Sequence, residues 1–111
     1  MKIAVIGANG FIGRNLVKVL KKKHKLTKIT RKTKFLNLKT NFDIIIHAAN
    51  SSKKYEASKN QKKDFNNSVR LTRKIIKFFK NNKIILISTI SVSNEKNIYS
   101  KNRKICENLV L

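Results

Sequence analysis

Two side chains near the end of the sequence have the types and the spacing needed to move a proton. Tyr99 precedes Arg103 by four residues, and residues with this spacing lie on the same face of a helix. A positive charge beside a phenol lowers its pKa, so such a tyrosine can act as general acid or base on a hydroxyl or carbonyl group. A hydroxyl from Ser88 or Thr89 can hold the same oxygen atom. Together these residues indicate acid–base chemistry on an oxygen-bearing carbon.

Strands have to position these groups, and the apolar pattern predicts where the strands lie. Unbroken apolar runs at residues 44–46 and 84–87 are typical of buried strands. His47 and the small residues up to Ser52 follow the first run, and a hydroxyl-rich segment follows the second at 88–93. Ligands of an open α/β sheet bind at the carboxyl ends of its strands, so both segments are candidates for the site. His47 itself is expected to be packed or hydrogen-bonded rather than catalytic.

The three glycines of the chain lie together between an expected strand and an expected helix. Residues 2–6 are apolar and partly β-branched, which predicts a buried strand, and a helical period begins at Phe11. Gly7 would permit a tight turn, Gly10 the approach of a pyrophosphate to the backbone, and Gly13 close packing of helix on strand. Backbone N–H groups and a helix N-terminus can hold a phosphate there. The spacing therefore predicts dinucleotide binding.

The remaining pattern predicts an α/β fold with a mainly parallel sheet of about five strands. Further short strands are expected at 26–30 and 35–38, and helices at 11–23, from Asp64 onward and at 98–111. The space before residue 44 is too small for a full crossover helix. The residues expected to face the core are Ile12, Leu16, Val19 and Leu20 in the first helix, Phe65, Val69, Thr72, Ile76 and Phe79 in the second, with Leu71 and Ile75 widening that stripe, and Ile98, Ile105, Cys106 and Leu109 in the third.

The end of the second expected strand bears on the choice of cofactor. An acidic residue at this point of a dinucleotide-binding fold accepts hydrogen bonds from the ribose of NAD. Arg31 and Lys32 stand there instead, and the first acid of the chain is Asp43. An arginine can pair with the 2′-phosphate of NADP. The sequence therefore favours NADP, with NAD as the alternative.

Composition limits the class of protein. At 111 residues the chain is expected to be one domain, over residues 1–111. Its net charge of +22 is spread along the chain with few aromatics, and the 22 Lys, 15 Ile and 14 Asn are residues with AT-rich codons, so no specific nucleic-acid binding is expected. The chain has one cysteine, and its two histidines, His24 and His47, are not at a spacing typical of metal ligands, so no metal site is predicted. No signal peptide or membrane span is evident, so a cytoplasmic protein is expected.

Several segments, in the right order, resemble the extended short-chain dehydrogenase/reductases, the NAD(P)-dependent epimerase/dehydratase family. Residues 7–13, Gly-Ala-Asn-Gly-Phe-Ile-Gly, resemble its glycine motif, and residues 43–49, Asp-Ile-Ile-Ile-His-Ala-Ala, its fourth-strand segment. Asn66 or Asn67, followed by Thr72, resembles its asparagine before the long helix. Ile87 to Val92 resemble the strand and loop with the catalytic Ser or Thr, and Tyr99 to Glu107 the Tyr-x-x-x-Lys-x-x-x-Glu helix.

The resemblance implies a Rossmann-like doubly wound fold, a nucleotide-sugar substrate and a set of site residues. The implied catalytic residues are Thr89, Tyr99 and Arg103, and the implied cofactor-binding residues are Gly7, Asn9, Gly10, Phe11, Ile12, Gly13, Arg31, Asn37, His47, Ala48, Ala49 and Ser88. Hydride would pass between nicotinamide and a sugar carbon, with the tyrosine as acid or base. The family resemblance also implies that the long helix and the last helix can form a dimer interface.

Two departures from the family pattern leave other functions open. Arg103 stands at the position of the family's catalytic lysine and cannot relay a proton, because it stays protonated. Family members also continue into a substrate domain, whereas this sequence ends at Leu111, so a truncated cofactor-binding part is expected. A homodimer or a complementing chain would then cover the sheet edge. The alternatives are an NADP(H)-binding sensor or partner-regulating module without chemistry, and an inactive fragment.

Overall fold

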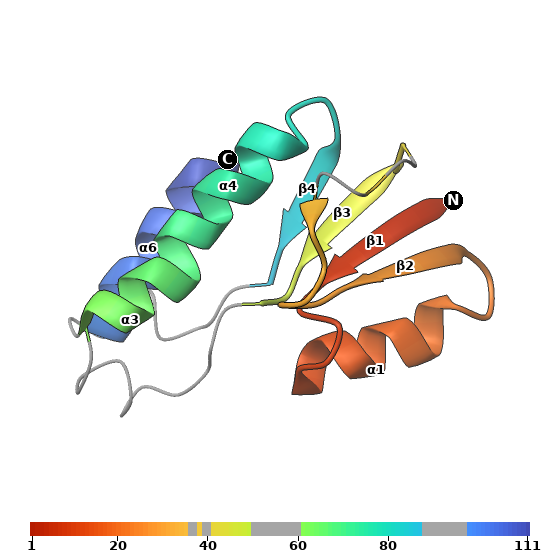
Figure 1. The fold of residues 1–111 in the computed structure, drawn as a ribbon, viewed down its shortest axis with the longest axis horizontal. Coiled ribbons are helices and arrows are strands. Elements are labelled where there is room, and N and C mark those ends of the chain that lie inside the picture. Colours follow the sequence, from red (N-terminus) through yellow and green to blue (C-terminus); the bar gives the residue numbers. More distant parts are fainter. Residues whose placement is uncertain (36–37, 39–40, 50–60, 88–97) are drawn as a thin grey trace.

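The computed structural model describes residues 1–35, 38, 41–49, 61–87 and 98–111, with residues 98–100 by their backbone only. Four parallel strands form one sheet in the order β2-β1-β3-β4. Helix α1 covers one face, while α4 and α6 lie side by side on the other (Figure 1). The elements are β1 (Lys2–Ile6), α1 (Phe11–Leu20), β2 (Lys25–Ile29), β3 (Ile44–His47), α3 (Gln61–Phe65), η2 (Asn66–Arg70), α4 (Leu71–Phe78), β4 (Lys83–Leu86) and α6 (Ile98–Val110).

The expected parallel α/β sheet is confirmed, with four strands in the described part of the chain. Phe35 and Leu38, the described members of the expected strand at 35–38, do not belong to a strand. The other two residues of that segment lie outside the described residues. Within the described residues, no helix is long and apolar enough to cross a membrane.

Alternation along β1 divides the core between the two faces of the sheet. Successive side chains of a strand point to opposite faces, so Ile3 and Val5 pack towards α1 and Ala4 and Ile6 towards α4. The face of α1 contributes Val17, with Leu16 and Leu20 partly buried beside it. The opposite cluster consists of Ala4, Ile6, Ile29, Phe35, Phe42, Ile45, Ile75 and Phe79.

The inward face predicted for α1 is correct at Leu16 and Leu20 and wrong at Ile12 and Val19. Ile12 and Val19, expected in the core, are 47% and 66% exposed, and the buried residues are Gly13 and Val17. The cause is steric, because a Cβ atom on Gly13 would overlap the carbonyl oxygen of Gly7. This contact turns the glycine side of the helix towards the sheet and Ile12 towards solvent.

The long helical segment after residue 60 follows the predicted stripe and contains one irregular turn. Val69, Thr72 and Phe79 are buried as predicted, and Ile75 is buried with them. Between α3 and α4 the backbone widens to the π-helix η2, a form often found at functional sites. In α6, Cys106 is buried as predicted, whereas Ile105 is 37% exposed because the inward side carries Asn102 and Arg103.

An aromatic cluster packs on the sheet face that the short connection between β2 and β3 crosses. The ring of Phe35, from this connection, lies 5.4 Å from the rings of both Phe78 and Phe79 at the end of α4. The ring of Phe42 lies 6.2 Å from that of Phe79, and Lys74 places its ammonium group 4.9 Å from the centroid of Phe35. The ring of Phe35 thus covers part of the apolar face of the sheet, although the connection that carries it has little room for a crossover helix.

Loss of the Phe35 ring should therefore destabilise the domain. Phe35→Ala removes a ring that is 8% exposed, and we expect the free energy of unfolding to fall by about 3 to 5 kcal/mol. Urea unfolding followed by far-UV circular dichroism measures the change. Phe11→Ala is the matched control, since Phe11 is 75% exposed and its loss should change stability by less than about 0.5 kcal/mol. Equal effects of the two changes would contradict this account of the connection.

Candidate cofactor and active site

The glycine turn joins the carboxyl end of β1 to the N-terminus of α1 and lies against the ends of both neighbouring strands. Gly7 has a φ of +82°, a conformation that favours glycine. Its N–H and that of Ala8 donate to the carbonyl of Ile29 at the end of β2, at 2.9 and 3.3 Å. A Cβ atom on Gly7 would lie 2.6 Å from the carbonyl oxygen of Ala48, just beyond β3. The turn is thus packed tightly between β2 and β3.

Gly10 and Gly13 differ in what surrounds them. Gly13 has no room for a side chain, because its Cβ atom would overlap the carbonyl group of Gly7. At Gly10 a Cβ atom would meet one neighbour, the Gly7 oxygen at 3.3 Å. The tight turn and the close packing predicted for Gly7 and Gly13 are confirmed, and cofactor contact by these residues stays a prediction.

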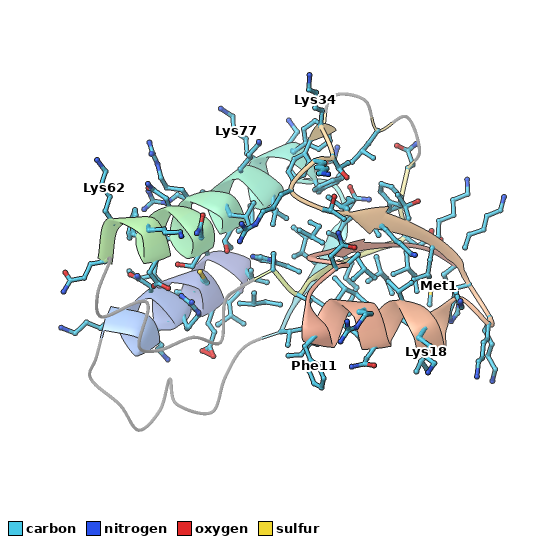
Figure 2. The ribbon with its side chains drawn as sticks, turned by 60° about the horizontal axis from the view of Figure 1, so that its bottom comes forward. Met1, Phe11, Lys18, Lys34, Lys62 and Lys77 are labelled. Carbon is cyan, nitrogen blue, oxygen red and sulfur yellow. The ribbon has the colours of Figure 1, made fainter. Side chains whose placement is uncertain are left out.

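The beginning of α1 fits a phosphate group. Gly10 is the N-cap residue and provides no side-chain hydrogen bond to the first turn, which also contains no acidic residue. Free N–H groups at a helix N-terminus and the positive end of the helix dipole attract anions. Phe11 begins the helix with its side chain directed away from the sheet (Figure 2). Asn9 and Ile12 are also exposed, so this corner of the molecule is accessible to a ligand.

Arg31 lies in the neighbouring turn, two residues after Ile29. The turn is closed by hydrogen bonds from the Thr30 N–H to Oγ1 of Thr33 at 3.1 Å and from the Lys32 N–H to Oγ1 of Thr30 at 3.3 Å. Arg31 itself is exposed. Because the carbonyl of Ile29 accepts hydrogen bonds from the glycine turn, Arg31 lies two residues along the chain from a residue that contacts this turn.

His47, at the end of β3, is fully buried and hydrogen-bonded, as expected. Its Nδ1 accepts from the Ala49 N–H at 3.3 Å, and its Nε2 lies 2.9 Å from Oγ1 of Thr72. The Thr72 hydroxyl donates to the carbonyl of Ser68 at 2.7 Å, so it accepts from His47, which fixes the neutral Nε2–H tautomer. Burial, with a smaller contribution from the charge of Arg103, lowers the pKa of His47 to about 4.

Arg103 forms a buried ion pair with a residue of the long helical segment. Its Nη2 lies 2.9 Å from Oδ1 of Asp64, and its Nη1 lies 3.2 Å from Oδ2. The side chain of Asn102 donates to the same Oδ2 at 2.6 Å. These contacts join α6 to α3, and direct contact of Arg103 with a cofactor stays a prediction.

The other predicted site residues are placed only in part. Ala48 and Ala49 are partly buried beside the glycine turn. Tyr99 lies in the first turn of α6, one helical turn before Arg103. Asn37, Ser88 and Thr89 lie outside the described residues. Among the described residues, no three His, Cys, Asp or Glu side chains are grouped as metal ligands would be.

Sequence reasoning did not identify Asp64 and Asn102 as partners of Arg103. The sequence contains one indication of such a contact, which is the spacing of polar residues along the helix. Asp64 precedes Ser68 and Thr72 at intervals of four residues, which places three polar residues along one side of a helix otherwise expected to be apolar. A polar row within a buried stripe indicates a polar partner on the facing element. The row does not say which element that is.

The fold and the glycine turn together define a Rossmann-like domain. The sequence matches the NAD dependent epimerase/dehydratase family over residues 3–105, and the chain belongs to this family. No match was found among curated proteins.

Several solved structures have a fold similar to that of this chain. Pal from Bacillus thuringiensis has a TM-score of 0.84 and 23% identity, over 99% of this chain and 50% of that protein. UDP-glucuronic acid 4-epimerase from Bacillus cereus, in complex with UDP-glucuronic acid and NAD, has a TM-score of 0.84 and 21% identity, over 98% and 51%. The dTDP-4-dehydrorhamnose reductase from Bacillus anthracis, in complex with NADP, has the same score and identity, over 98% and 49%. The chain thus spans about half the length of these proteins.

The buried neutral His47 predicts a loss of stability in acid. Unfolded histidine binds a proton near pH 6.5, whereas folded His47 does so near pH 4, so the unfolded state binds more protons between these values. Stability should fall below pH 6.5 by about 1.4 kcal/mol per pH unit until about pH 4. Urea midpoints measured across this range test it.

Two glutamine variants isolate the contribution of His47 to this slope. His47→Gln removes the titrating ring and should flatten the slope between pH 6.5 and 4. His24→Gln changes a residue outside this network and should leave the His47 contribution in place. An unchanged slope in His47→Gln would show that other groups cause the acid sensitivity.

Proposed function

We propose that this chain is the NAD(P)-binding part of an epimerase, dehydratase or reductase that acts on a nucleotide sugar in the cytoplasm. The observation that carries the proposal is the glycine turn, because its backbone leads into the uncapped N-terminus of α1 beside the carboxyl ends of β2 and β3. Family membership supports the reaction class. The structures of similar fold that contain NAD, NADP or UDP-glucuronic acid support the choice of ligands.

The cofactor would be held by backbone and side chains from three neighbouring turns. Gly10 and the first N–H groups of α1 would bind the pyrophosphate, with Gly7 and Gly13 shaping the turn. Arg31 would bind the 2′-phosphate of NADP. The remaining residues proposed to line the cofactor are Asn9, Phe11, Ile12, Asn37, His47, Ala48, Ala49 and Ser88. When bound, the nicotinamide accepts or donates a hydride.

The chain's own proton chemistry is proposed for Tyr99. Its phenol would give a proton to, or take one from, the reacting sugar oxygen, and Thr89 would align that oxygen by a hydrogen bond. The contribution of Arg103 follows from its ion pair with Asp64. Because the chain spans half of its structural relatives, the rest of the substrate site would come from further polypeptide or from a second subunit.

Binding of the cofactor tests the proposal directly. Calorimetric titration at physiological salt should show saturable binding of NADPH or NADH. Gly10→Ala should weaken this binding at least about tenfold, because the added methyl group lies where the phosphate would approach. The variant should stay folded, because the contact of the Cβ atom with the Gly7 oxygen at 3.3 Å requires only a small shift of the backbone, and thermal melting checks this. Wild-type protein that is folded and binds neither cofactor would refute the proposal.

Arg31 provides a separate test of cofactor choice. Arg31→Ala should weaken NADPH binding by roughly tenfold or more and NADH binding much less, because NADPH alone carries the 2′-phosphate. Lys22→Ala removes the same charge beyond the other end of α1 and should affect both cofactors slightly and equally. An equal loss of both cofactors in Arg31→Ala would show that this residue does not select NADP.

A further inference from the structure

The ion pair of Arg103 is buried on both sides. The side chain of Arg103 is 2% exposed and that of Asp64 is 6% exposed. Two parallel contacts, Nη2 to Oδ1 at 2.9 Å and Nη1 to Oδ2 at 3.2 Å, match the guanidinium fork to the carboxylate. Such a bidentate pair fixes the orientation of both groups, which a single-point lysine contact does not.

Asp64 is itself held from several directions. Its Oδ2 accepts from Asn102 at 2.6 Å as well as from Arg103, so two consecutive residues of α6 bind one carboxylate. Its main-chain carbonyl accepts from the Ser68 hydroxyl at 2.6 Å, within the π-helical turn η2. The carboxylate is therefore a fixed point on α3, and α6 is attached to it.

The attachment lies one helical turn from the proposed acid–base residue. Tyr99 and Arg103 belong to the same helix, so the ion pair limits how far the first turns of α6 can shift or rotate. The carboxylate also balances the charge of Arg103 inside the protein. A guanidinium group bound in this way is suited to placing a helix and unsuited to relaying a proton.

We propose that Asp64 and Arg103 are positioning residues whose ion pair holds α6, and with it Tyr99, against α3 and η2. Arg103 thus serves the site through the placement of Tyr99, in place of the direct catalytic role that the family resemblance implies. The proposal rests on the proposed function only where it assigns the acid–base role to Tyr99. The attachment of α6 can be tested without any cofactor.

A double-mutant cycle with neutral amide residues tests the attachment. Asp64→Asn removes the carboxylate bound to a buried arginine, and Arg103→Gln removes the guanidinium group bound to a buried carboxylate, so each change should lower the melting temperature by roughly 10 °C or more. The double variant removes both charges together, and the amide oxygen introduced by Asp64→Asn can still accept from Asn102. This variant should melt within about 5 °C of the wild type. Lys104→Gln, at the exposed neighbour of Arg103, is the control and should change little.

The position of Tyr99 can be observed separately from global stability. The chain has no tryptophan and two tyrosines, so Tyr55→Phe leaves Tyr99 as the single source of the near-UV circular dichroism band of tyrosine. In this background, at low temperature where each variant remains folded, the single variants should lose most of the band and the double variant should keep it. A pair that adds general stability alone would leave the band unchanged in all of them.

Cofactor affinity separates positioning from direct contact. The double variant should bind NADPH within about threefold of the wild type, because it buries no unpaired charge and keeps the contact of Asn102 with position 64. A folded double variant that binds NADPH tenfold more weakly would overturn the proposal and assign Arg103 to the cofactor. A double variant no more stable than the weaker single variant would also overturn it. If the wild type binds no cofactor, the proposed function fails, while the melting and dichroism results still decide the attachment.

Discussion

The contact between Gly13 and the carbonyl group of Gly7 sets the geometry on which the candidate site depends. A Cβ atom at position 13 would overlap that oxygen, so α1 can approach the end of β1 only with a glycine there. This approach determines the rotation of α1, which buries Val17 and leaves Phe11 exposed. It also directs the N-terminus of α1 towards the carboxyl edge of the sheet, where the strands of a parallel sheet present their loops. The contact that packs α1 on the sheet therefore also places the helix N-terminus proposed to bind a phosphate.

On the opposite face, buried polar groups determine how the helices meet the sheet. His47 binds Thr72, whose oxygen lies 3.3 Å from the sulfur of Cys106, so one hydroxyl group connects β3, α4 and α6. Asp64 and Arg103 connect α3 and α6. Each of these groups would be costly to bury alone, and their mutual hydrogen bonds remove that cost only in one arrangement. Apolar packing brings the helices together, and the polar contacts select their register.

The sequence predicts the parts of this structure that depend on local pattern. The isoleucine runs specify β3 and β4, and the glycine spacing specifies the turn after β1, because neighbouring residues decide both. The inward face of α1 was predicted only in part, since a hydrophobic period gives no weight to glycine, and the decisive contact of Gly13 is with backbone. Asp64 could not be assigned to Arg103, because the two residues are 39 positions apart and a helical pattern does not name its partner. The roles of Tyr99 and Thr89 stay proposals from residue type, spacing and resemblance, because a pattern along the chain does not show which side chains meet.

Because acidic residues are scarce in this chain, the buried carboxylate of Asp64 matters more to the structure than it would in a protein with equal numbers of acidic and basic residues. The chain has five acids against 27 Lys and Arg residues, and the four lysines labelled on α1, the β2–β3 connection, α3 and α4 project outward from separate segments (Figure 2). Charge spread in this way repels itself and attracts anions without selecting among them. Exposed lysines are surrounded by water and contribute little to a particular geometry. Two described acids instead bind specific groups, Asp43 the N–H of Lys2 at 2.7 Å and Asp64 the fork of Arg103. In a chain with this excess of positive charge, the buried carboxylate of Asp64 gives the last helix a specific ionic attachment to α3.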